Sequence, residues 1–159
     1  MTKKYLIFSS VMFTLFFIGC KDKVVKVNQD TEIAGTVDSV FQKYENGQIS
    51  RTYIRIGGKI DGEMKDFYPT GELKSLRYFE DDNQIGKSTF FFQSGAIKEV
   101  QYYADGLRQL ADTMFYESGK IQYITEFKDD KRNGIFRSLN EDGSVIFDLR
   151  YKGDVLVQD

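Results

Sequence analysis

Clusters of acidic residues are the side chains of this sequence best suited to catalysis. They occur at Glu80-Asp81-Asp82, Asp129-Asp130 and Glu141-Asp142. Two carboxyl groups held several ångströms apart across a cleft can supply the acid and the base of a glycoside hydrolase. The sequence contains no histidine, so the most frequent general base and a principal zinc ligand are missing. A catalytic function would therefore depend on these acids.

The single cysteine, Cys20, indicates a different kind of chemistry. Lys3 and Lys4 precede a short apolar segment, residues 5–19, which ends directly before Cys20. This order is typical of a secretory signal peptide, and the segment is too short to span a bilayer comfortably. Phe17-Ile18-Gly19-Cys20 resembles the bacterial lipobox, which implies that the thiol is lipidated and that the protein attaches to a membrane through this lipid. An uncleaved membrane helix is the alternative.

The anchor divides the chain into three parts. Residues 1–19 are predicted to be the signal peptide, residues 20–32 the lipidated cysteine with a polar tether, and residues 33–159 a folded domain. Lys21 stands where enteric lipoproteins retained in the inner membrane carry aspartate, so the resemblance implies anchoring in the outer membrane of a bacterial envelope. The net charge of -2 argues against nucleic acid as a partner, because binding phosphates requires a basic face.

The folded part of the chain repeats itself. Five glycines follow one another at intervals of 24 residues, and we call them the marker glycines: Gly47, Gly71, Gly95, Gly119 and Gly143. A small polar residue precedes each one, which is typical of a hairpin turn. A second pair of turn-forming residues stands ten and eleven residues later in every unit, as at Asp105-Gly106. The spacing predicts one up strand and one down strand per unit, and hence an all-β fold.

The acidic clusters coincide with these turns. Asp81-Asp82 and Asp129-Asp130 occupy the second turn of their units, and Asp142 precedes a marker glycine. Aspartate is preferred in turns because it bonds to the nearby backbone and tolerates left-handed conformations. No segment shows the spacing of an EF-hand, a nucleophile elbow or a phosphate-cradling glycine loop. The sequence therefore predicts a protein that is not an enzyme and that uses no metal ion or cofactor.

Aromatic residues are the candidates for a binding surface. The chain has 14 Phe and 10 Tyr, and most of these rings are expected to hold neighbouring strands together by cross-strand packing. Tyr102 and Tyr123 are the candidate binding residues, because they fall outside the apolar positions shared by the up strands. In the middle units these shared positions lie two, five and eight residues after the marker. Either both sheet faces are partly apolar or a bulge shifts the alternation.

Aromatic residues and marker glycines together resemble the MORN repeat variants, a family sometimes labelled antitoxin-like. The resemblance rests on Tyr44-x-x-Gly47, Tyr68-x-x-Gly71, Phe92-x-x-Gly95 and Tyr116-x-x-Gly119. It implies a row of β-hairpins that forms an elongated, twisted antiparallel sheet, with contacts between successive units.

Three functions are compatible with these features. The first, which we favour, is a lipid-anchored, non-catalytic module that presents its sheet to a protein or another envelope partner. The second is an antitoxin or immunity-like protein that neutralises a toxin. The third is a carboxylate-dependent hydrolase, which would require an acid outside the turn positions in a concave pocket.

Overall fold

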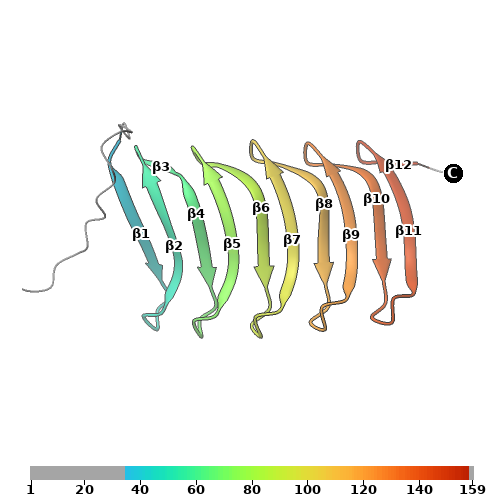
Figure 1. The fold of residues 1–159 in the computed structure, drawn as a ribbon, viewed down its shortest axis with the longest axis horizontal. Coiled ribbons are helices and arrows are strands. Elements are labelled where there is room, and N and C mark those ends of the chain that lie inside the picture. The colour runs from blue at the N-terminus through green and yellow to red at the C-terminus, as the bar shows by residue number, and fades with distance from the viewer. Residues whose placement is uncertain (1–34, 158–159) are drawn as a thin grey trace, which may run out of the picture. The chain divides into compact units, whose positions relative to one another are not determined.

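The computed structural model describes residues 35–157 (Figure 1). The predicted signal peptide, Cys20 and the predicted tether lie outside the described residues. The strands are β1 (Val37–Lys43), β2 (Ile49–Ile56), β3 (Lys59–Ile60), β4 (Gly62–Phe67), β5 (Leu73–Glu80), β6 (Asn83–Phe91), β7 (Ile97–Ala104), β8 (Leu107–Phe115), β9 (Ile121–Lys128), β10 (Lys131–Leu139), β11 (Val145–Lys152) and β12 (Val155–Val157). Among residues 35–157, no helix is long and apolar enough to cross a membrane.

All strands belong to one antiparallel sheet of 12 strands. Eleven of them follow one another in chain order across the sheet, and the short β3 pairs with β2 beside this path. Figure 1 shows the strands side by side, with the connecting turns alternating between the two edges of the sheet. This arrangement confirms the all-β prediction of tandem hairpins.

The two kinds of turn have different backbone conformations. The marker glycines have φ angles between 84° and 104°, and each donates its N–H to the carbonyl three residues earlier, as Gly119 does to Tyr116 at 2.9 Å. In the second turn both central residues have positive φ, for example 50° and 62° at Asp129 and Asp130, which defines a type I′ hairpin. Both turns therefore require left-handed backbone, but at one residue in the first kind and at two in the second.

A bulge in each hairpin decides which residues share a face. Opposite Asp66 and Phe67 of β4, the register of β5 shifts by one residue between Leu73 and Ser75. Beyond this shift Ser75, Arg77 and Phe79 point to one face, which we call the Ser75 face. Leu76 and Tyr78 point to the other, the Tyr78 face. The apolar positions five and eight residues after the marker thus lie on opposite faces, so both explanations of the uneven spacing hold.

A second bulge lies in the down strand of each unit, and one unit has an exceptional residue there. The bulge position is occupied by Gly62, Gly86 and Gly134 in the first, second and fourth units, and by Leu110 in the third. Leu110 keeps the left-handed backbone, with φ 61°, and its side chain is 65% exposed. This conformation is unfavourable for a residue with a Cβ atom. Leu110 is therefore a strained residue that presents an apolar side chain to solvent.

Tyrosine hydroxyls join successive units at the edge that carries the marker-glycine turns. The hydroxyl of Tyr44 donates to the carbonyl of Phe67 at 2.7 Å, and Tyr68 bonds the corresponding carbonyl of Phe91 at 2.8 Å. Tyr116 makes the same bond one unit before the end of the sheet. These bonds explain physically why the sequence places tyrosine three residues before the marker glycine.

Aspartates join the units at the opposite edge. The Oδ1 atom of Asp82 accepts a hydrogen bond from the backbone N–H of Ile60 at 2.8 Å. The Oδ1 atom of Asp130 accepts the equivalent bond from Arg108 at 3.0 Å. The backbone N–H of each aspartate also donates to the carbonyl of the same partner residue. The acids predicted to serve turns therefore do so, and they link neighbouring hairpins as well.

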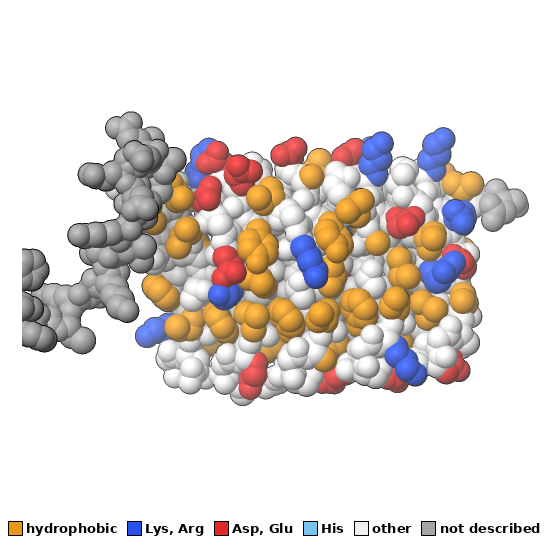
Figure 2. All heavy atoms as spheres, in the orientation of Figure 1, with side chains coloured by type: hydrophobic (Ala, Val, Ile, Leu, Met, Phe, Trp, Pro, Cys, Tyr) orange, Lys and Arg blue, Asp and Glu red, His pale blue; other side chains and the backbone are white. Residues whose placement is uncertain are grey.

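The packed side of this single-layer sheet is the Ser75 face. Its fully buried side chains include Ser75, Ser88 and Ser138, and the buried hydrophobic residues are Tyr53 and Met64. Towards β11, aromatic rings pack across the strands of this face, with Phe136 and Phe147 centroids 4.9 Å apart. Figure 2 shows one face of the sheet, where hydrophobic side chains form a row across the strands and charged side chains lie along both edges and at separate places between them.

Candidate functional site

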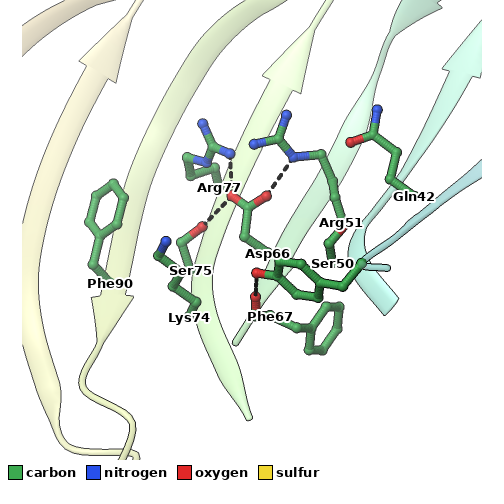
Figure 3. A pocket seen from close by; sticks show the side chains of 10 residues that line it. Gln42, Ser50, Arg51, Asp66, Phe67, Lys74, Ser75, Arg77 and Phe90 are labelled. Atoms are coloured by element: carbon green, nitrogen blue, oxygen red, sulfur yellow. Dashed lines mark hydrogen bonds and ion pairs between the residues drawn. The ribbon is translucent and has the colours of Figure 1, made fainter. Parts of the chain in front are cut away.

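A cleft of about 430 Å³ opens beside the buried Ser75. Strands β1, β2, β4, β5 and β6 and the first marker turn supply its walls (Figure 3). The lining residues are Gln42, Tyr44, Ser50, Arg51, Asp66, Phe67, Lys74, Ser75, Arg77 and Phe90. Side chains from three successive repeat units therefore meet in one site.

Asp66 lies at the centre of the cleft, between two arginines. Arg51 donates its Nε–H to Oδ1 of Asp66 at 2.5 Å, and Ser75 donates its hydroxyl to Oδ2 at 2.7 Å. Arg77 forms an ion pair with the same Oδ2 atom. The register explains the arrangement, because Arg51 and Ser75 both stand directly opposite Asp66 on its two neighbouring strands. Figure 3 shows the two arginines converging on Asp66.

The surroundings of Asp66 keep its carboxyl group ionised. Burial by itself would raise the pKa of Asp66. Hydrogen bonds from Arg51 and Ser75 and the positive charges of Arg77 and Arg51 outweigh this effect, so the pKa is lowered. An ionised carboxylate that already accepts bonds from three side chains is a poor general acid and a poor nucleophile. Asp66 therefore holds Arg51, Ser75 and Arg77 in fixed positions around it.

A second group of polar residues occupies the same face further along the sheet. Gln101 donates its amide to Glu99 at 2.5 Å and to Asp112 at 3.3 Å, and Tyr103 donates its hydroxyl to Gln101 at 2.8 Å. Burial, followed by the negative charge of Glu99, raises the pKa of Asp112 to about 7. The Oδ1 atom of Asp112 is buried and has no hydrogen-bond partner among the described residues. The Gln101 amide therefore bridges the carboxyl groups of Glu99 and Asp112.

The turn acids resemble Asp66 and differ from Asp112, because hydrogen bonds lower their pKa values. The pKa of Asp130 is lowered, first by the backbone hydrogen bond from Arg108 and then by its side chain. The pKa of Asp154 is lowered for the same reasons, with Arg132 as the partner. Among residues 35–157, no group of three or more acidic, cysteine or histidine side chains is placed to hold a metal ion.

The two tyrosines predicted to bind do not lie together. Tyr102 stands opposite Lys87 and Gln109 and therefore belongs to the Tyr78 face. Tyr123 stands opposite Met114 on the Ser75 face, where its ring centroid is 6.5 Å from that of Phe147. Tyr102 and Tyr123 stand seven and four residues after their marker glycines, and this odd difference places them on opposite faces.

Sequence reasoning missed Asp66, Glu99 and Asp112, although a signal for Asp66 exists. At intervals of 24 residues, the position of Asp66 is occupied by Phe90, Met114 and Ser138. A charged residue among uncharged equivalents on a packed face indicates a local interaction that the repeat does not require.

These features define the chain as a tandem β-hairpin repeat protein with a charged cleft on its packed face. Comparison with protein families finds the MORN repeat variant at residues 60–81 and 113–129. The first segment includes Asp66, Ser75 and Arg77, and the two segments together cover less than half of the chain.

Comparison with solved structures finds accessory secretory protein 1,2 and 3 in Streptococcus pneumoniae, at 17% identity and a TM-score of 0.38. The match covers 64% of this chain and 19% of that chain, so this chain spans about a fifth of its length. A comparison with curated proteins finds no match.

Proposed function

We propose that this protein is a non-catalytic binding module that is lipid-anchored in the bacterial envelope and holds a protein or another envelope partner against its Ser75 face. One observation carries the proposal, namely the cleft around Asp66. Its central carboxylate is held ionised by Arg51 and Arg77, so the cleft offers charged contacts to a partner.

The construction of the sheet supports a binding function. Hydrogen bonds join successive hairpins along both edges, from tyrosine hydroxyls at one edge and from aspartates at the other. These bonds hold the side chains of neighbouring units at fixed separations. A preorganised surface loses less conformational entropy when a partner binds.

Capture of a partner from native membranes tests this function. The wild-type protein and an Arg51→Glu variant would be used as bait, with Arg137→Glu as the matched control. Arg51 and Arg137 are similarly exposed, at 38% and 34%, and both are ion-paired to an aspartate. Arg137 stands opposite Ile124 and Asp148, on the Tyr78 face. We expect Arg51→Glu to lose the partner and Arg137→Glu to keep it, and equal capture by both would contradict the proposal.

The identity of the captured protein also tests the antitoxin alternative. A toxin that loses its activity on binding the bait would assign the protein to the immunity-like class. Any other envelope component would favour an assembly role.

The anchor requires its own experiment. Cys20→Ser should abolish incorporation of a fatty-acid analogue, because the thiol is the group that the predicted lipobox acylates. The unlipidated chain should then be recovered as a precursor or in a soluble fraction. Label retained by this variant would contradict the predicted anchor.

A carboxylate-dependent hydrolase is the second candidate, and the Glu99–Asp112 pair is the observation that favours it. Paired carboxyl groups also occur in aspartic proteases. The buried Oδ1 atom of Asp112 argues against this role, because it faces away from solvent. Loss of hydrolysis of an envelope polymer or peptide in a folded Asp112→Asn variant would replace the binding proposal with the catalytic one.

A further inference from the structure

The cleft around Asp66 has more hydrogen-bond donors than acceptors. Asp66 accepts bonds from Arg51, Ser75 and Arg77. The same Nη2 atom of Arg77 also donates to the Sδ atom of Met64 at 3.2 Å, and the buried Nε atom of Arg77 has no partner among the described residues. Guanidinium N–H groups therefore remain without a partner on each arginine. Lys74 and Ser50 also line the cleft, and neither side chain donates a hydrogen bond to another described residue. The Lys74 ammonium lies 5.7 Å from the centroid of the Tyr68 ring. A ligand of this cleft must therefore supply acceptor atoms.

The cleft is also strongly cationic for a protein of this composition. Arg51, Arg77 and Lys74 contribute three positive charges and Asp66 one negative charge, which leaves +2 among the lining residues. The whole chain has a net charge of -2. A local positive charge on an acidic protein attracts anions selectively to that place.

The other repeat units do not contain this arrangement. Residues at 24-residue intervals from Arg51 are Ser75, Glu99, Tyr123 and Phe147. Those equivalent to Arg77 include Tyr53, Gln101 and Thr125. Because those units form the same hairpins without paired arginines, the repeat fold does not require them.

The charge of the cleft selects among anions. A phosphate monoester carries close to two negative charges at neutral pH and has three acceptor oxygens, so it can neutralise the cleft. A carboxylate would leave one positive charge without a partner. Tyr44 and Phe90 line the same cleft and provide apolar contacts for the organic group that bears the phosphate.

We infer that the cleft formed by Arg51, Lys74 and Arg77 around Asp66 binds a phosphate monoester group of the partner. This inference rests on the proposed binding function and names the ligand chemistry of the same site. The phosphate oxygens accept bonds from the unused guanidinium groups and from Lys74, while Asp66 and Ser75 hold the arginines in place.

Nuclear magnetic resonance titration of the full-length lipidated protein in detergent micelles tests the inference. The probes are inorganic phosphate, glycerol 3-phosphate, and acetate as a monoanionic comparison. We expect saturable shifts of the Asp66 and Ser75 amides with both phosphates, and an affinity for acetate lower by about tenfold or more. Absence of saturable shifts with the phosphates, or equal affinity for acetate, would overturn the inference.

Variants locate the binding. Arg51→Gln should lose the shifts, and Lys74→Gln should weaken binding by about tenfold through the loss of one charge-assisted bond. Lys74 makes no ion pair with another described residue, so its replacement leaves the Asp66 network intact and separates binding from folding. Arg137→Gln is the matched control and should bind phosphate like the wild type. Unchanged binding by both Arg51→Gln and Lys74→Gln would refute the site.

A further binding experiment identifies the kind of molecule that carries the phosphate. Vesicles of phosphatidylcholine with and without phosphatidic acid would be compared with soluble glycerol 3-phosphate. Stronger binding to the phosphatidic acid vesicles, lost in Lys74→Gln, would identify a lipid headgroup, whereas equal binding to the soluble ester would identify a free or polymer-borne phosphate.

The capture experiment keeps the two proposals separate. If Arg51→Glu loses the partner but no phosphate probe binds, the binding function holds and the phosphate assignment fails. If phosphate binds but capture does not depend on Arg51, the proposed function fails.

Discussion

The row of tyrosine hydroxyls that joins the units is interrupted at Phe92. Tyr44, Tyr68 and Tyr116 each donate to a carbonyl 23 residues further along the chain. Phe92 occupies the same repeat position and has no hydroxyl, so the carbonyl of Phe115 lacks this donor. Replacing Phe92 by tyrosine should supply the missing bond and stabilise the fold.

The surroundings of the ring indicate that the hydroxyl will fit. The Nζ atom of Lys98 lies 5.9 Å from the centroid of the Phe92 ring, and that of Lys74 lies 5.7 Å from the Tyr68 ring. The two rings therefore occupy equivalent sites. A hydrogen bond of this kind contributes about 0.5–1.5 kcal/mol net, which corresponds to a rise of about 2–8 °C in Tm for a domain of this size.

Urea unfolding of three variants measures this effect. Phe92→Tyr should raise the midpoint, Tyr68→Phe should lower it by a similar amount, and Phe91→Tyr should give no comparable gain. The slope of the unfolding free energy against urea concentration should stay constant, since the surface exposed on unfolding does not change. An unchanged midpoint for both Phe92→Tyr and Tyr68→Phe would refute the reasoning, because the hydroxyl bonds would then contribute nothing to stability.

Three further predictions concern residues with left-handed backbone and the protonation of Asp112. Leu110→Gly should raise the unfolding free energy, measured by urea unfolding, by about 0.5 kcal/mol. The strain energy that is removed with the left-handed leucine slightly exceeds the entropy cost of introducing glycine. A lower unfolding free energy in this variant would contradict the claim that Leu110 is strained. Gly106→Val and Gly119→Val should each destabilise by about 1–3 kcal/mol, since their φ angles are 79° and 84°. A lower unfolding free energy in only one of the two variants would contradict the conclusion that both positions require left-handed backbone. The pKa of Asp112 is raised to about 7, so the folded state binds this proton more tightly than the unfolded state. Stability should therefore rise as the pH falls from 8 towards 5, and Asp112→Asn should reduce this dependence. The Tm measured by thermal unfolding across this pH range tests the prediction. The same change of Tm with pH in the wild type and in Asp112→Asn would disprove it.

Much of the fold could be predicted from the sequence because its determinants are local. A glycine or aspartate in a turn reports a left-handed backbone at that residue, and the 24-residue interval places every such turn. The apolar spacing, however, could not distinguish a bulge from an apolar second face. The structure contains both, since Leu76 and Phe79 lie on opposite faces beyond the shifted register.

The candidate site depended on the tertiary structure. Arg51, Asp66 and Arg77 are 15 and 11 residues apart along the chain, and only the pairing of β2, β4 and β5 brings them together. Sequence by itself determined the hairpins, their order and the residues of both turns. The sheet decided which side chains meet, because successive residues of a strand alternate between faces and one bulge reverses that alternation. Tyr102 and Tyr123, selected because they fall outside the shared apolar positions, lie on opposite faces, while Arg51, Asp66 and Arg77 lie on one.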